Sequence, residues 1–136
     1  MWRWKYAVIV ILFLAMPLLV PAEKPPFLGQ ASEYEVWTGA NSSAGRKVLY
    51  SGEYAVVDVR ALGGVAYESE LPAENVLSSL GATVLFTEQV CGVTSYYAVA
   101  DLPFAVELNG KTVNLQVAVR EDGSVKVGSP IIFGAY

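Results

Sequence analysis

The chain has 136 residues and a mass of 14.6 kDa, which suits one small domain, and its 54% hydrophobic composition is too apolar for intrinsic disorder. Nine Lys and Arg residues stand against 13 Asp and Glu residues, so the net charge of −4 excludes a broad cationic surface for nucleic acid. Because the chain has no histidine, Ser-His-Asp catalysis, Cys-His catalysis and His-ligated zinc are also excluded.

Residues 1–22 have the pattern of an export signal, in which Arg3 and Lys5 precede an apolar run over residues 7–20. This run of 14 residues is shorter than the roughly 20 residues that span a bilayer. We therefore predict a signal peptide that is cleaved after Ala22, with an uncleaved N-terminal membrane anchor as the alternative. Both predictions place the rest of the chain outside the cytoplasm, either secreted or anchored by its N-terminus.

The exported part is more acidic than the whole chain. Without Arg3 and Lys5 it keeps 7 of the 9 basic residues against all 13 acidic ones, a net charge of about −6. Cys91 is the only cysteine, so no disulfide can form within the chain. We interpret it as an incidental thiol, ahead of an intermolecular disulfide partner or a nucleophile, since a nucleophile would lack its usual histidine base.

The pattern after residue 22 predicts a proline-containing, mobile spacer over residues 23–32 and a single domain over residues 33–136. Alternating or β-branched runs predict strands over residues 33–38, 47–50, 54–60, 65–67, 82–89, 93–99, 104–108, 112–120 and 125–127, with 130–133 as a last extended piece. One helix is predicted over residues 72–80, where apolar side chains recur at helical spacing. Short connections favour antiparallel neighbours, so we expect an α+β fold, mainly an antiparallel sheet with one helix packed on one face.

The turn dipeptide Asn109-Gly110 sets the register of one hairpin. A two-residue turn there places Val106 opposite Val113 and Phe104 opposite Leu115, with both pairs facing the core.

A second turn lies near Asp122-Gly123. A two-residue loop there would oppose Lys126 to Val119 and bury the lysine, so we prefer a three-residue loop over residues 121–123. That loop pairs Val119 with Val125 and, two residues further on, Val117 with Val127.

Carboxylates for general acid and base catalysis are available in the second half of the chain, at Glu88, Asp101 and Glu107. We interpret them as the solvated face of a sheet, because nothing in their spacing fixes a shared geometry. The three aspartates, Asp58, Asp101 and Asp122, are too widely spaced for a calcium loop, and no phosphate-binding glycine motif is present. No metal and no cofactor are therefore predicted.

Aromatic and amide side chains are the candidates for binding. Tyr96 and Tyr97 are adjacent in a predicted strand and so point to opposite faces. The aromatic residues that could form a stacking platform for sugar rings or peptide are Trp37, Tyr50, Tyr54, Tyr67, Tyr96 and Tyr97. Asn114 and Gln116 are poor strand formers on the face opposite Leu115. We interpret this stripe as an ordinary solvated face, with amides that hydrogen-bond to a ligand or to a neighbouring segment as the alternative.

Residues 81–136 resemble the C-terminal part of the YwmB-like family of small exported proteins from spore-forming Gram-positive bacteria. The likeness is carried by the strand before Thr94-Ser95-Tyr96-Tyr97-Ala98, by the hairpin arm Gly110-Lys111-Thr112-Val113-Asn114-Leu115, and by the closing run from Val127 to Phe133. The resemblance implies an α+β domain of the kind labelled TATA-box-binding-like. It implies no enzymatic activity and transfers no functional residues.

These observations predict a noncatalytic extracytoplasmic domain that binds a protein or a cell-envelope component, and the resemblance adds a link to sporulation. The alternatives are a small cell-envelope hydrolase that uses carboxylates and a sugar-binding module that uses exposed aromatics. The predicted binding residues are Trp37, Tyr96, Tyr97, Asn114 and Gln116. Nucleic acid is not an expected partner, and membrane contact is expected only through residues 1–22 if they are not cleaved.

Overall fold

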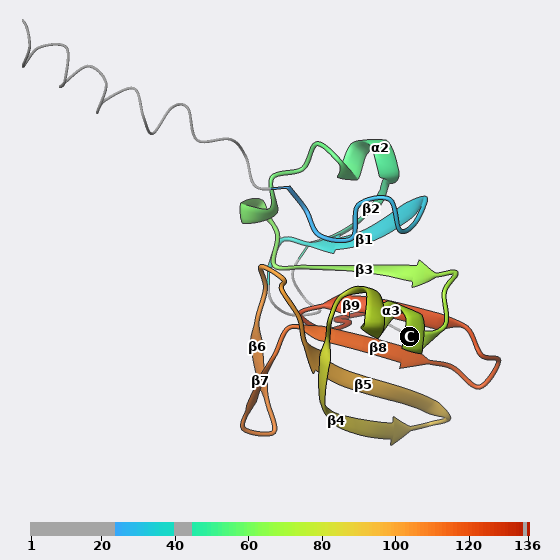
Figure 1. Cartoon of the computed structure of the whole chain (residues 1–136). Helices are drawn as coiled ribbons and strands as arrows, with labels where there is room; N and C mark the ends of the chain where they lie inside the picture. Colours follow the sequence, from blue (N-terminus) through green and yellow to red (C-terminus); the bar gives the residue numbers. More distant parts are fainter. Residues whose placement is uncertain (1–23, 40–44, 135) are drawn as a thin grey trace, which may run out of the picture.

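The computed structural model describes residues 24–39, 45–134 and 136, so the predicted export segment lies outside the described residues. Within them, seven antiparallel strands form one sheet in the order β2-β1-β3-β9-β8-β5-β4, and two more form the separate hairpin β6-β7 (Figure 1). The strands are β1 (Glu33–Trp37), β2 (Arg46–Tyr50), β3 (Gly64–Ser69), β4 (Thr83–Val90), β5 (Val93–Val99), β6 (Val106–Leu108), β7 (Lys111–Val113), β8 (Leu115–Val119) and β9 (Val125–Ser129). The mainly antiparallel α+β class is confirmed.

The predicted helix is present as α3 (Ala73–Ser79). Pro72 is its N-cap residue, Glu74 lies in the first turn near the positive end of the helix dipole, and Gly81 has the left-handed φ of 61° that follows its end. Val76 is buried in the hydrophobic core, and Leu77 packs against that core. Two shorter helical segments accompany α3, namely the four-residue α2 (Ser51–Tyr54) and the 3-10 helix η2 (Val59–Ala61).

The Asn109-Gly110 turn is confirmed, with φ values of 51° and 73°, and it pairs Val106 with Val113 as predicted. The predicted pairing of Phe104 with Leu115 is wrong, because Leu115 pairs with Ala98 of β5 instead. The single strand predicted over residues 112–120 divides at Asn114 into β7 and β8. Leu115 is nevertheless a fully buried core residue.

The three-residue loop over residues 121–123 is also confirmed. Val119 pairs with Val125 and Val117 pairs with Val127, while Gly123 takes a left-handed φ of 86°.

The strand predicted over residues 54–60 is wrong. Tyr54 ends α2, and its buried phenol donates a hydrogen bond of 2.7 Å to the carbonyl of Pro26. Further on, the Asp58 side chain accepts the backbone N–H of Arg60 and caps η2. These local bonds favour helical turns over pairing, and Val56 between them is 85% exposed.

Residues 24–32 do not form the mobile spacer that the prolines predicted. Phe27 is buried and its ring packs 5.1 Å from that of Tyr67, while its carbonyl accepts the Tyr34 hydroxyl at 2.6 Å. Tyr34 in turn stacks on Tyr54 at 4.1 Å. This aromatic cluster joins residues 24–32 to the folded domain.

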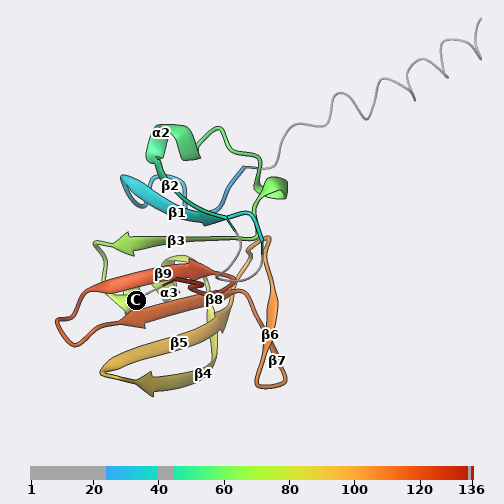
Figure 2. The same ribbon diagram turned by 180° about the vertical axis from the view of Figure 1, so that it is seen from behind.

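The sheet has two faces with different covers. The helix face carries Leu115, Val117 and Val127, which belong to the core that includes Val76 of α3. Helix α3 lies in front of the sheet in Figure 1 and behind it in Figure 2. The strap face carries the alternate residues, including Gln116 and Gly128. Residues 130–134 and 136, which we call the strap, pack against part of this face at Gln116 and Gly128.

Candidate functional site

Three of the five predicted binding residues come together on the strap face. Gln116 of β8 pairs with Tyr97 of β5 on one side and with Gly128 of β9 on the other, and Trp37 of β1 pairs with Gly64 of β3. These three residues and their glycine partners contact or neighbour the strap. We call the whole set the strap cradle: Trp37, Gly64, Tyr97, Gln116 and Gly128. Trp37 and Gln116 are 0% and 1% exposed, so neither forms part of an open surface.

Gln116 makes the polar contacts of the strap cradle. Its Oε1 accepts the backbone N–H of Ile132 at 2.9 Å, and its Nε2 donates to the Tyr136 hydroxyl and to the Ser95 Oγ, both at 3.0 Å. A buried amide must be hydrogen-bonded to avoid a desolvation cost, so the strap satisfies Gln116. Of the alternatives for this side chain, the neighbouring segment is the one observed, and ordinary solvation is wrong.

The shape of the strap cradle depends on two glycines within strands. A Cβ atom on Gly64 would lie 2.7 Å from Cε2 of Phe133, and a Cβ on Gly128 would lie 2.6 Å from Cγ1 of Ile132. Phe133 also contacts Trp37 edge-on, with ring centroids 5.9 Å apart. Glycine weakens a strand interior, and here it makes room for the strap side chains.

Tyr97 closes the other side of the strap cradle. Its ring stacks on Phe86 with centroids 4.7 Å apart, and it is 7% exposed. Burial, followed by the neighbouring Tyr136 hydroxyl, raises the pKa of Tyr97 to about 12. Tyr97 is therefore a neutral, packed side chain rather than part of an exposed stacking platform.

The other two predicted residues lie elsewhere. The Asn114 amide bridges the backbone of Ala100, accepting its N–H at 2.8 Å and donating to its carbonyl at 2.6 Å, which explains the strand break at this residue. Tyr96 faces the helix side and lines an apolar groove of about 520 Å³ between α3 and the strands β4, β5 and β8, with Leu77 and Val84 among the other lining residues.

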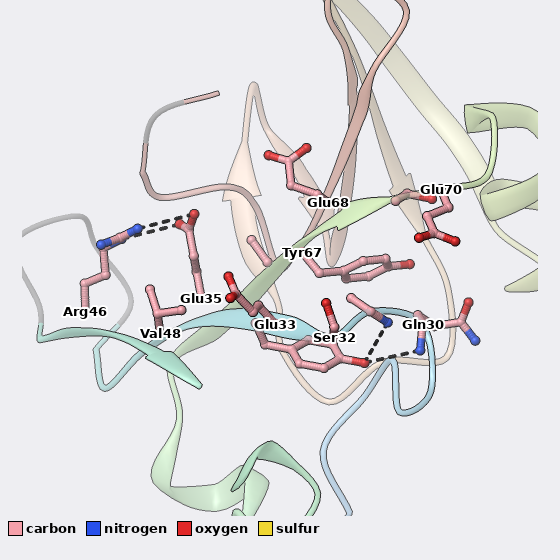
Figure 3. Close-up of a pocket in the computed structure, with 13 residues that line it drawn as sticks. Gln30, Ser32, Glu33, Glu35, Arg46, Val48, Tyr67, Glu68 and Glu70 are labelled. Atoms are coloured by element: carbon pink, nitrogen blue, oxygen red, sulfur yellow. Dashed lines mark hydrogen bonds and ion pairs between the residues drawn. The ribbon is translucent and has the colours of Figure 1, made fainter. Parts of the chain in front are cut away.

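A second groove opens between β1 and β3 (Figure 3). These strands pair from Trp37 and Gly64 only as far as Glu35 and Ala66, although both continue beyond that point. Where they diverge, they leave an open groove of about 400 Å³, which we call the split groove. It is lined by residues 30–35, Arg46, Val48 and residues 66–70.

Charge in the split groove is only partly compensated. Glu35 is close to Arg46, at 3.4 Å, and to Lys126, whose Nζ lies 3.1 Å away. Lys126 is buried on the strap face. The three-residue loop was preferred because it would leave this lysine exposed; the loop is present, but the lysine is buried on the other face of the sheet. Its pairing with Glu35, 91 residues earlier, offsets that burial.

Glu68 is the second compensated carboxylate of the split groove. The Arg120 guanidinium donates two hydrogen bonds to it, at 2.8 and 2.6 Å, and so holds the pKa of Glu68 below its ordinary value. Glu33 and Glu70 are exposed and make no ion pair within the described part of the chain. The repeated Glu-x-Glu spacing at 33–35 and 68–70 was the sequence signal for this groove, and sequence reasoning missed it.

The predicted catalytic candidates occupy separate elements. Glu88 lies on β4, Asp101 follows β5 and Glu107 lies on β6, and all three are exposed. In the described residues no group of three or more Cys, Asp and Glu side chains could hold a metal ion. Cys91 is an exposed free thiol in the turn between β4 and β5.

Comparison with known proteins adds no relative, since no family model, no curated protein and no solved structure matches this chain. Of the helices among residues 24–39, 45–134 and 136, none has the length and apolar character needed to cross a bilayer.

Proposed function

We propose that the chain is a noncatalytic, extracytoplasmic interaction domain that receives an extended segment of a cell-envelope protein in the split groove. The observation that carries this proposal is the divergence of β1 and β3 after Glu35 and Ala66, which leaves two strand edges facing an open, half-polar groove. Unpaired strand edges are templates for an added strand, because their N–H and C=O groups need an extended partner.

The charge of the split groove favours a segment that carries Lys or Arg. Glu33 and Glu70 lie on opposite walls and come from β1 and from the end of β3, and Figure 3 shows them toward different ends of the groove. An extended segment crossing the groove can therefore place one cationic side chain near each carboxylate. The net charge of about −6 on the exported part supports the same choice and argues against a nucleic-acid partner.

The proposed location and ancestry rest on the sequence. The basic residues and apolar run of residues 1–22 support export, with the mature chain beginning near Glu23, and residues 81–136 support a relationship to the YwmB-like family. N-terminal sequencing of the protein from its native envelope tests the first of these. Recovery of the intact segment from Met1 would replace the signal peptide with an anchor.

Site-specific photocrosslinking in intact cells tests the groove. Val48 lines the split groove and is 50% exposed, whereas Val56 is 85% exposed and lies outside it, so the two valines form a matched pair for a crosslinking side chain. We expect a discrete crosslinked envelope protein from position 48 that is absent from position 56 and is weakened by Glu33→Gln with Glu70→Gln. Identical crosslinks from both positions would contradict the proposed groove.

A further inference from the structure

We propose that the strap cradle is a binding site for an extended segment, occupied within this chain by the strap, and that a second copy of the chain donates the same segment to it. This inference is independent of the split groove. It concerns Trp37, Gly64, Tyr97, Gln116 and Gly128 on the strap face and the side chains that they receive.

Side-chain contacts, rather than a strand ladder, hold the strap on the sheet. Among the described residues no backbone–backbone hydrogen bond joins the strap to the sheet. Its attachment is instead the Gln116 amide, which binds one backbone N–H and one phenol, together with the ring contact between Phe133 and Trp37. Specific polar groups in a mostly apolar concavity are the usual composition of a ligand site.

The shape of the site selects particular side chains. The edge of the Phe133 ring packs on Gly64, and Ile132 packs on Gly128. A side chain on either glycine would overlap the strap side chain that packs there. The segment that fits is therefore extended and apolar, with a phenylalanine after an isoleucine and a tyrosine three residues beyond the phenylalanine. The run from Pro130 to Tyr136 supplies that pattern.

An empty strap cradle is unfavourable, and this determines the occupant. If the strap left, Gln116 would lose its contacts with Ile132 and Tyr136 and keep only Ser95, while Trp37 would become exposed. The strap of a second copy restores every one of these contacts. Occupancy within the chain and between copies then differs mainly by effective concentration, which is the condition for exchange of an identical element.

The test uses the whole exported chain, residues 23–136, and a labelled synthetic peptide with the sequence of residues 130–136. Phe133→Ala weakens the chain's own strap but leaves the strap cradle intact, so we expect it to bind the peptide at least about tenfold more tightly than the parent does. Trp37 is the only tryptophan of the exported chain, and its fluorescence reports occupancy directly. Adding Gly128→Ala to Phe133→Ala should abolish binding, because the new methyl group fills the Ile132 position.

A second variant covers the case in which Phe133→Ala does not fold. Tyr136→Phe removes only one hydrogen bond from the strap, and it should bind the peptide more weakly than Phe133→Ala but above the parent. Failure of the peptide to bind whichever of the two variants is folded would overturn the site. Binding that persists with Gly128→Ala would overturn it as well.

The second copy is tested separately. Isotope-labelled and unlabelled parent chains, mixed at high concentration, should give mixed dimers by native mass spectrometry, and Gly128→Ala should suppress them. Peptide binding without mixed dimers would keep the strap cradle as a site and overturn the donation between copies. Crosslinking at the split groove does not depend on either result, so the two proposals fail independently.

Discussion

Each face of the sheet is packed against another segment of the chain, but by different chemistry. On the helix face Leu115, Val117 and Val127 pack against an apolar core that includes α3. On the strap face the covered residues include Gln116 and Lys126, each satisfied by a partner far away in sequence. Apolar packing tolerates exchange of similar side chains, whereas buried polar groups require particular partners. We therefore expect the apolar packing of the helix face to contribute more to stability, and the polar contacts of the strap face to contribute more to specificity.

We expect the largest loss in the free energy of unfolding when a buried side chain on the helix face is shortened. Leu115 is 0% exposed, and Leu115→Ala should lower the free energy of unfolding by about 2–5 kcal/mol, the range for a buried leucine. Urea unfolding measures the loss. A change below about 0.5 kcal/mol would show that Leu115 does not anchor the core.

A smaller loss is expected from removing polarity on the strap face. Gln116→Leu keeps a similar volume but leaves the N–H of Ile132 and the hydroxyls of Ser95 and Tyr136 without this amide, which should cost about 1–3 kcal/mol.

Amide exchange separates a loss on the strap face from a general one. Protection should fall at Ile132 more than at Val117, which lies on the helix face. Equal loss of protection at both positions would remove the proposed division of roles.

Alkaline pH distinguishes the faces through Tyr67 on the helix face and Tyr97 on the strap face. Burial raises the pKa of Tyr67 on the helix face and of Tyr97 on the strap face to about 12, above the ordinary value of 10. A raised pKa in the folded state means that the folded form holds the proton more tightly than the unfolded form does. The stability that each protonated tyrosine contributes is therefore fully present below about pH 10 and is lost as the pH rises to about 12.

The strap contributes to only one of these two shifts. Tyr136 raises the pKa of Tyr97 but is not among the causes for Tyr67, so Tyr136→Phe should lower the first pKa and leave the second unchanged. Titration of the tyrosine Cζ chemical shifts by NMR resolves the two rings. A common shift of both would mean that the variant loosens the whole domain.

Local signals predicted the elements whose causes are local. The Asn109-Gly110 turn, the loop over residues 121–123 and the helix α3 each depend on a few neighbouring residues, and each was confirmed. The alternation in β8 correctly placed Leu115 and Gln116 on opposite faces.

The sequence did not predict that the strap packs on the sheet. The hydrophobic pattern of residues 130–134 does not indicate that they pack on a sheet. Gln116 and Ile132 come within hydrogen-bond distance only because β8 and β9 pair. A polar residue alternating with apolar ones therefore predicted a wet face. The same limit hid the split groove, because the divergence of β1 and β3 depends on pairing between segments about 30 residues apart.

The smallest effect is expected at a position that belongs to neither face. Cys91 and Gly92 form the turn after the last pair of β4 and β5, with φ values of 52° and 80°, nearly those of Asn109 and Gly110. Both are left-handed positions, which asparagine adopts more readily than cysteine does.

Cys91→Asn should therefore raise the free energy of unfolding by about 0.5 kcal/mol, a fraction of the roughly 1–2 kcal/mol left-handed penalty. Asn109→Cys is the reciprocal variant and should lower it by a similar amount, while Cys91→Ser should stay within about 0.5 kcal/mol of the parent. Because the thiol is exposed and has no cysteine partner in the chain, peptide binding at the strap cradle should be unchanged in Cys91→Asn. A large loss of stability in Cys91→Ser would instead show that the thiol itself supports the hairpin, and that the turn is more than a connection between two strands.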